Sequence, residues 1–210
     1  MLSIPLRPLA SLACLVLATA FSLSLPSAGQ APAASETSTW KLDPVHSVAL
    51  FRIHHLKSGM FWGRVNALEG TVTYAEDGSS APVFDVTASI EQIDTGSEKL
   101  DGNLKGPNFF NAKEFPTLSF KSTGGDRTPD GQWRVSGDLS IRGQTKSVTT
   151  LVEVTGFGGT PVEAHAGFEA TLTIKRSDFG MSWGIEKPAA VLSDDVKLVV
   201  SLEGIQSRGQ

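Results

Sequence analysis

The sequence is short of several residue types, and each shortage argues against a class of protein. Cys14 is its only cysteine, so a disulfide framework within the chain is excluded. Lys and Arg number 18 against 22 Asp and Glu, and a formal net charge of −4 without a basic run argues against nucleic-acid binding. The 21 glycines and 11 prolines are too few for a collagen-like or low-complexity chain. The length of 210 residues is sufficient for one domain with a sizeable core.

Residues 1–33 have the layout of a secretory signal peptide. One cation, Arg7, precedes the apolar stretch Leu9–Leu25, and small residues follow it. This layout predicts cleavage between Ala28 and Ala34 and export to the periplasm or out of the cell. An uncleaved membrane anchor is the alternative, but the stretch is short for a bilayer span and contains Ser and Thr.

Cys14 lies inside the apolar stretch, whereas the cysteine of a lipoprotein signal would follow it. We therefore expect no lipid attachment and, after cleavage, a chain that has no cysteine and does not span a membrane. Loss of Arg7 from the 18 cations leaves 17 against 22 anions, a net charge of −5. Such a domain depends on packing for its stability, and metal sites with thiolate ligands are excluded.

Apolar and polar residues alternate with the period of a β-strand through most of the remaining chain. In residues 83–93, for example, Phe84, Val86 and Ala88 share one face and Asp85 lies on the other. Residues 98–111 are the best candidate for a short helical segment. The eight predicted strands are Trp40–Leu56, Phe61–Tyr74, Val83–Ile93, Pro116–Thr123, Gln132–Ile141, Ser147–Phe157, Ala164–Lys175 and Asp195–Ile205.

Eight long strands with one apolar face can form a sandwich or a closed barrel, and closure removes the unpaired edges. We predict an all-β fold, an extended eight-stranded antiparallel barrel. Strands of ~12 residues would give an interior ~30 Å deep after tilt, which suits a long chain better than a compact metabolite. The alternative is an outer-membrane barrel. Asp85 and Glu91 share the face opposite the aliphatic one and aromatic girdles are missing, and both features disfavour that alternative.

Five motifs in register along the chain resemble those of one known protein family. The first reads Asp-x-x-His-Ser from Asp43 and continues as an apolar strand to His-Leu at Leu56. The sequence, over residues 38–206, is identified as a member of the polyisoprenoid-binding, YceI-like family. The other motifs are Ile93–Gly96, Asp101–Phe120 with its Phe-Phe pair, Gly137–Lys146, and Arg176–Gly180 followed by Asp194–Val196.

The resemblance implies a lipocalin-like barrel whose apolar tunnel binds an isoprenoid chain or a similar amphiphile, of the quinone or polyprenyl phosphate type. It also implies a role in lipid transport or storage, commonly in the bacterial periplasm. Leu100 and Asn103 stand where the family often has Arg and His, so contacts from that Arg and His to a ligand headgroup are not expected here.

The strand faces and the long connections supply the candidates for contact with such a ligand. Apolar side chains would bind the aliphatic chain, at ~0.8 kcal/mol per buried methylene, and a cation at the tunnel mouth would meet the polar head. Ordinary core packing of the aromatic residues and a surface position of the cations are the alternatives. The candidates are Phe51, Phe84, Phe109, Phe110, Phe120, Arg142, Arg176, Phe179, Trp183 and Leu198.

The four histidines do not predict a metal site. His46 and His54 would lie ~26 Å apart along one extended strand, and His54 and His55 would point to opposite faces. His165 is expected to be alone on a distant strand, and His46 to pair with Asp43. We therefore expect neither a metal nor a cofactor.

The arrangement of a nucleophilic enzyme is also missing. Ser47 and His46 are neighbours on a strand, so their side chains would point apart, and no Gly-x-Ser-x-Gly motif occurs. We predict a binding protein whose partner is an isoprenoid or other long-chain amphiphilic lipid, and a homodimer is left open. Two alternatives remain: a lipocalin-like enzyme acting on a lipid-derived substrate, and a stress-protective structural envelope protein with a filled barrel.

Overall fold

The computed structural model describes residues 37–186 and 191–207, so the predicted signal peptide lies outside the described residues. This part of the chain consists of strands, one α-helix and two short 3-10 turns. The strands are β1 (Ser38–Leu42), β2 (Val48–His55), β3 (Gly59–Val65), β4 (Glu69–Tyr74), β5 (Val83–Ser89), β6 (Ile93–Asp94), β7 (Thr117–Arg127), β8 (Trp133–Ile141), β9 (Gln144–Gly159), β10 (Glu163–Lys175) and β11 (Leu192–Ser207). The helices are η1 (Ile90–Gln92), α1 (Glu98–Lys105) and η2 (Arg176–Phe179).

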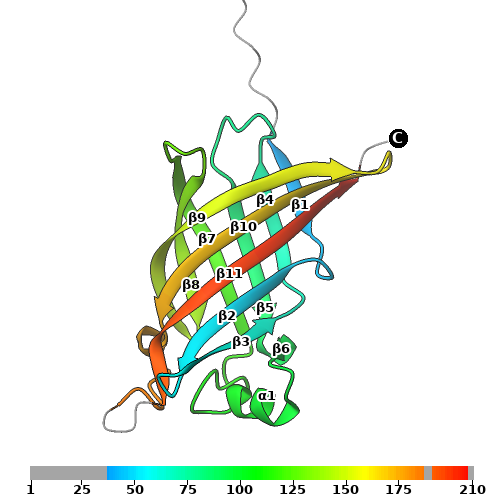
Figure 1. Cartoon of the computed structure of the whole chain (residues 1–210). Coiled ribbons are helices and arrows are strands. Elements are labelled where there is room, and N and C mark those ends of the chain that lie inside the picture. The colour runs from blue at the N-terminus through cyan, green and yellow to red at the C-terminus, as the bar shows by residue number, and fades with distance from the viewer. Residues whose placement is uncertain (1–36, 187–190, 208–210) are drawn as a thin grey trace, which may run out of the picture. The chain divides into compact units, whose positions relative to one another are not determined.

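The sheet closes on itself because β1 pairs with β4 on one side and with β11 on the other (Figure 1). The closed ring runs β1-β4-β5-β7-β8-β9-β10-β11, with antiparallel pairing throughout. It is the predicted eight-stranded barrel. β2, β3 and β6 extend it at one end, where β2 continues along β11, β3 pairs with β2, and β6 pairs with β3.

The predicted strand Trp40–Leu56 is interrupted in the structure at residues 43–47. Asp43 Oδ1 accepts a hydrogen bond from the backbone N–H of Val45 at 2.8 Å, and Pro44 has no N–H to contribute to a ladder. Both ends of the turn stay attached to β11, since Asp43 N donates to Glu203 O at 2.8 Å and Glu203 N donates to Ser47 Oγ at 3.1 Å. The break therefore divides one long strand into β1 and β2 without opening the barrel.

The predicted alternation is confirmed in β5, where Phe84, Val86 and Ala88 are buried and Asp85 is exposed. In β5 the aliphatic face thus turns into the barrel and the charged face turns outward.

Helix α1 begins at Glu98 as predicted but ends at Lys105, before the expected limit of residue 111. Gly106 caps it, and Pro107 cannot donate the next helical hydrogen bond. The residues that follow form turns, in which the N–H of Phe110 bonds to Leu104 O at 3.0 Å. Figure 1 places α1 beside β6 at the extended end of the barrel. Among the described residues, no helix has the length and apolar character needed to cross a membrane.

Candidate functional site: an apolar tunnel

The interior of the barrel holds a cavity of about 710 Å³. Its wall is built from the inward faces of β2, β3, β5 and β7 to β11, together with α1 and the long connections. Along β11 the lining extends from Leu192 to Leu202, roughly 30 Å along the strand. Most of the described residues that line it are apolar, and the polar ones are His55, Thr87, Asn103, Ser119, Thr150 and Arg176. The barrel is therefore hollow over much of its length.

Buried aromatic residues close one end of the tunnel. Trp40 and Phe168 are 0% and 1% exposed, and the Phe168 ring packs edge-on against Phe84, which is part of the tunnel wall, at 5.7 Å between centroids. Trp133 donates its indole N–H to the Tyr74 hydroxyl at 3.2 Å. That bond satisfies two polar groups that would be costly to bury unpaired. This end of the barrel is thus a solid core, which we call the closed end.

The opposite end of the tunnel reaches the surface. His55, Asn103 and Trp183 all line the cavity, yet each of them is exposed to solvent. We call this the open end. Most of the tunnel wall is apolar, whereas a histidine and an amide stand at this rim, so the lining becomes more polar where the tunnel meets water.

Eight of the ten candidate ligand contacts lie in the tunnel wall. Phe109 and Trp183, from the two long connections, meet at the open end with 5.5 Å between their ring centroids. Whether these residues contact a ligand stays a prediction. The eight are Phe51, Phe84, Phe109, Phe110, Phe120, Arg176, Trp183 and Leu198.

Arg142 was predicted as a headgroup contact, but it is not among the described residues of the tunnel wall. It lies in the tight β8–β9 turn with φ of +50°, and its guanidinium donates to the carbonyls of Gly180 and Pro107. These carbonyls belong to the two long connections at the open end. Through these two hydrogen bonds, Arg142 links the two long connections to each other.

Phe179 is likewise not among the lining residues. The η2 turn packs it, 1% exposed, into a separate cluster with Ile141, Ile174 and Met181. Its role is core packing behind the wall, the alternative that the sequence left open.

Arg176 lines the tunnel and is 3% exposed, but its guanidinium is hydrogen-bonded to backbone carbonyls of the protein. Its Nε donates to Ser193 O at 2.8 Å and its Nη1 donates to Met181 O at 2.7 Å. Burial lowers the pKa of Arg176, and the nearby Asp194 carboxylate opposes that shift. Arg176 holds the connection before β11 in place and gives the tunnel wall one positive charge.

Several residues of the wall were missed as ligand contacts. His55 could have been found from strand parity, because it shares a face with Phe51, and it does line the tunnel. Leu100 and Asn103 line the tunnel from α1. The sequence signal for them was their position in the family motif, where Leu100 and Asn103 replace the Arg and His that the family often has.

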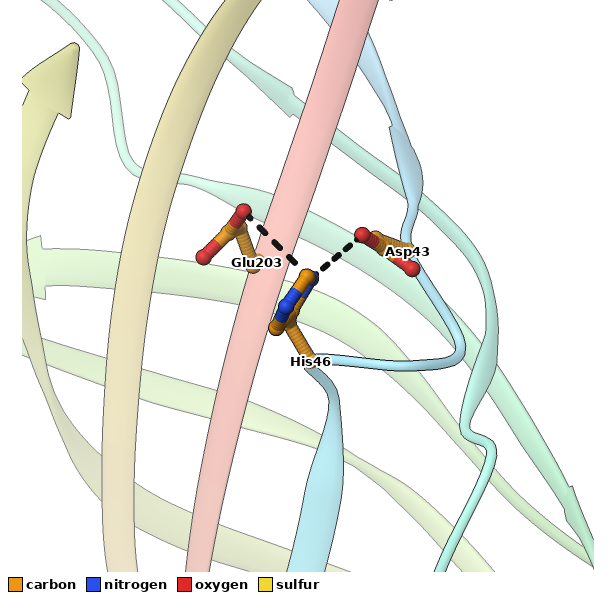
Figure 2. Close-up of side chains that lie close together, drawn as sticks. All are labelled: Asp43, His46 and Glu203. Atoms are coloured by element: carbon orange, nitrogen blue, oxygen red, sulfur yellow. Dashed lines mark hydrogen bonds and ion pairs between the residues drawn. The ribbon is translucent and has the colours of Figure 1, made fainter. Parts of the chain in front are cut away.

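A polar cluster lies on the outer wall of the barrel, where β1, β10 and β11 run side by side (Figure 2). His46 Nδ1 lies 2.6 Å from Asp43 Oδ2, as predicted, and 3.9 Å from Glu203 Oε1. The prediction that His165 would be alone is wrong, because its Nδ1 lies 2.7 Å from Glu203 Oε1 and its Nε2 lies 3.0 Å from Glu163 Oε1. Barrel closure and the pairing of β10 with β11 bring these residues together.

Hydrogen bonding to carboxylates governs the electrostatics of this cluster. Asp43 raises the pKa of His46, whose hydrogen bond in turn lowers the pKa of Asp43. Glu203, with a smaller effect of Glu163, raises the pKa of His165. Asp43, His46 and Glu203 have ligand atoms within 4.8 Å of one another, near enough for a metal ion. In the structure His46 is hydrogen-bonded to Asp43 and Glu203 is hydrogen-bonded to His165, and a metal ion would have to displace both hydrogen bonds.

Comparison with known proteins gives the family. The model of the YceI-like domain matches residues 40–204, within the predicted 38–206. A UPF0312 protein of Pseudomonas aeruginosa is 35% identical over 192 residues, covering 90% of this chain and 96% of the relative. A UPF0312 protein of Yersinia pestis is also 35% identical, over 162 residues, covering 77% of this chain and 82% of the relative.

Solved structures share the fold. BcnA of Burkholderia cenocepacia superposes with a TM-score of 0.66 at 21% identity, covering 77% of this chain and 98% of that one. A polyisoprenoid-binding domain from Saccharophagus degradans, implicated in plant cell wall breakdown, gives a TM-score of 0.62 at 15% identity, covering 82% and 100%. The match over residues 40–204 and the relatives at 35% identity show that this chain belongs to the family of proteins with a YceI-like domain.

Proposed function

We propose that the protein is an exported carrier or store that holds the chain of an isoprenoid, or of a similar amphiphilic lipid, in its tunnel. One observation carries the proposal: an elongated cavity of about 710 Å³ with a wall that is almost entirely apolar. This volume lies within the usual range for small-molecule sites. The polyisoprenoid-binding domain from Saccharophagus degradans, which shares the fold, supports the same ligand class.

The tunnel suits an amphiphile because its two ends differ. A chain inserted toward Phe84 would leave water completely, at ~0.8 kcal/mol per buried methylene. Its polar head would remain at the open end, beside His55 and Asn103. A quinone or a polyprenyl phosphate has this combination of a long apolar chain and one polar head.

We infer that the tunnel binds its ligand without transforming it. No carboxylate is among the described residues that line the tunnel, so a carboxylate pair for general acid–base catalysis is missing from its wall. The hydroxyl of Thr150 donates to the carbonyl of Thr171 at 3.1 Å, which occupies it structurally. A solidly filled structural barrel is the less suitable alternative, because the interior is hollow.

We propose further that residues 1–33 are removed on export and that the protein works in the periplasm or outside the cell. The support is the charge, apolar stretch and small residues of that segment. Intact-mass measurement should give a mature N-terminus between Gly29 and Glu36 in the soluble envelope fraction. An intact Met1 in the membrane fraction would contradict this.

The ligand itself is tested by native mass spectrometry of the mature protein, followed by organic extraction and lipid analysis. We expect an apolar-chain molecule in about one copy per protein. A tunnel-filling variant, Ala170→Trp, should lose this molecule, whereas Thr171→Trp on the exposed face of the same strand should keep it. Protein that is free of lipid in both the parent and Thr171→Trp would count against the proposal.

A further inference from the structure

The hairpin of β2 and β3 carries an unusual outer surface at the open end. Leu56, Met60 and Trp62 are 56%, 50% and 47% exposed, although side chains of this type are normally buried. Met60 pairs with His54 across the two strands, and Trp62 pairs with Arg52, whose guanidinium lies 5.6 Å from the indole centre. We call the surface formed by Arg52, Leu56, Lys57, Met60 and Trp62 the hairpin face.

The turn at the tip presents Leu56 and Lys57 to solvent at a conformational cost. Their φ angles are +52° and +57°, and the N–H of Ser58 bonds to His55 O at 3.1 Å across them. Turns with two positive φ angles favour Asn-Gly, because side chains such as Leu and Lys are strained there. Two unfavourable residues at this tip point to a role outside the stability of the fold.

The charge of the hairpin differs in sign from that of the chain. Residues 48–65 contain Arg52, Lys57 and Arg64 and no Asp or Glu, whereas the whole chain has a net charge of −4. Arg64 is paired with Asp94 at 2.7 Å. Within the described part of the protein, neither Arg52 nor Lys57 lies within ion-pair distance of a carboxylate. The hairpin face therefore joins exposed apolar side chains with unneutralised positive charge.

This face adjoins the open end of the tunnel. The backbone N–H of Leu56 donates to Val191 O at 2.8 Å, and both His55 and Val191 line the tunnel. Trp183, 50% exposed, also lines it. In Figure 1 the β2–β3 hairpin and α1 lie toward the same end of the barrel. Any surface that contacts the hairpin face would therefore lie next to the tunnel opening.

We propose that the hairpin face docks the protein on an anionic lipid bilayer, with the tunnel opening beside the membrane. The inference rests on the proposed function, because a lipid ligand has to enter from a membrane and return to one. Apolar side chains enter the interface, and Arg52 and Lys57 meet acidic headgroups. The positive charge favours this partner over a second copy of the same positive face.

The test is vesicle co-sedimentation of the full mature protein, with phosphatidylcholine vesicles that contain or lack phosphatidylglycerol. The parent should bind the anionic vesicles, and added salt should weaken the binding. The double variant Leu56→Asn, Lys57→Gly removes the apolar tip and one cation, and Asn-Gly relieves the strained turn. It should fold at least as stably as the parent and lose about tenfold or more in vesicle affinity.

A matched control exists at the other end of the barrel. Val162, 63% exposed, lies between β9 and β10, and Val162→Asn removes an exposed apolar side chain there. Its vesicle affinity should equal that of the parent. In the parent, brominated lipid should quench Trp62 and Trp183, which are about half exposed, and leave the buried Trp40 and Trp133 unquenched.

Four results would overturn the docking proposal. Three concern vesicles: no binding by the parent, unchanged binding by the double variant, or an equal loss of binding in Val162→Asn. The fourth is a parent protein that is dimeric and becomes monomeric in the double variant but not in Val162→Asn, which would make the hairpin face a dimer interface. Lipid extraction from the same preparations separates the two proposals. If the protein carries lipid but ignores vesicles, docking is wrong and the proposed function stands. If it carries none and still binds vesicles, the proposed function fails alone.

Discussion

The ring of Phe51 lies over the bare backbone of Gly63, its cross-strand neighbour on β3. A methyl group at Gly63 would overlap the Phe51 ring, so the absence of a side chain there lets the ring lie against the tunnel wall. The Phe120 ring on β7 also lies over a glycine, Gly137 on β8, which is its diagonal rather than its direct cross-strand neighbour. The glycines beneath Phe51 and Phe120 thus set how far these two rings project into the tunnel.

Gly63→Ala should push the Phe51 ring into the tunnel and lower lipid affinity by about tenfold, ~1.4 kcal/mol, because the methyl group and the ring cannot share the space. Lipid binding measured by titration checks this. The control is Gly124→Ala on β7, where a methyl group meets open space. Equal affinities of the two variants would show that the Phe51 position does not limit the ligand.

Leu198→Glu should abolish lipid binding and lower the free energy of unfolding by about 3 kcal/mol, since it places an unpaired charge in an apolar wall. Lys197→Glu introduces the same side chain on the outer face of the same strand, opposite Arg52. It should change stability by less than about 0.5 kcal/mol. Denaturant titration and lipid binding of both variants test whether Leu198 faces the tunnel and Lys197 faces outward. Unchanged stability and lipid binding in Leu198→Glu would refute this assignment.

Tyr74→Phe should destabilise the closed end by about 1–3 kcal/mol, because it leaves the buried indole N–H of Trp133 without an acceptor. Thermal unfolding checks this. The double variant with Trp133→Phe has no unsatisfied N–H, so its loss should be smaller than the sum of the two single losses. Strict additivity would mean that the Tyr74–Trp133 bond contributes little to stability.

The outer-wall cluster should make stability depend on pH. The folded-state pKa of His165 is raised above its ordinary value of 6.5, chiefly by Glu203. Its stabilisation is therefore complete below pH 6.5 and is lost as the pH rises through the raised pKa. Tm of the parent and of His165→Gln should be measured at increasing pH, starting above the range in which carboxylates are protonated. The difference between the two Tm values should become smaller as the pH rises. A difference that is constant or grows with pH would contradict this.

The outward histidines should matter little for the ligand. His54 shares a strand with His55 but faces away from the tunnel, and His165 lies in the outer-wall cluster. His54→Gln and His165→Gln should each leave lipid affinity within about tenfold of the parent. Titration of both variants with the extracted lipid is the measurement. Loss of binding in either one would place the binding site elsewhere than in the tunnel.

Local periodicity predicted where the chain is extended and which faces turn inward, but not the breaks that divide Trp40–Leu56 into β1 and β2 and Phe61–Tyr74 into β3 and β4. The alternation through Phe84, Val86 and Ala88 follows from the two-residue period of a β-strand, which needs no knowledge of partners. The strand break at Asp43 was missed, because an aspartate before a proline is also compatible with extended backbone. Recognition of the family depended on motifs that were in register along the chain, and comparison confirmed it.

The sequence by itself determined the strand-rich fold class, the family and the apolar character of the interior, since alternation is a local property and the family motifs can be read in order along the chain. The His46–Asp43 pair was predicted from its local spacing, but only the tertiary structure decided what Arg142, Arg176 and His165 contact. Arg142 joins the two long connections, and Arg176 donates to the carbonyl of Ser193 at the start of β11. His165 meets Glu203 because β10 and β11 pair, and barrel closure adds His46 to the same cluster. Such contacts join residues far apart in sequence, so their partners are fixed by closure and register rather than by spacing.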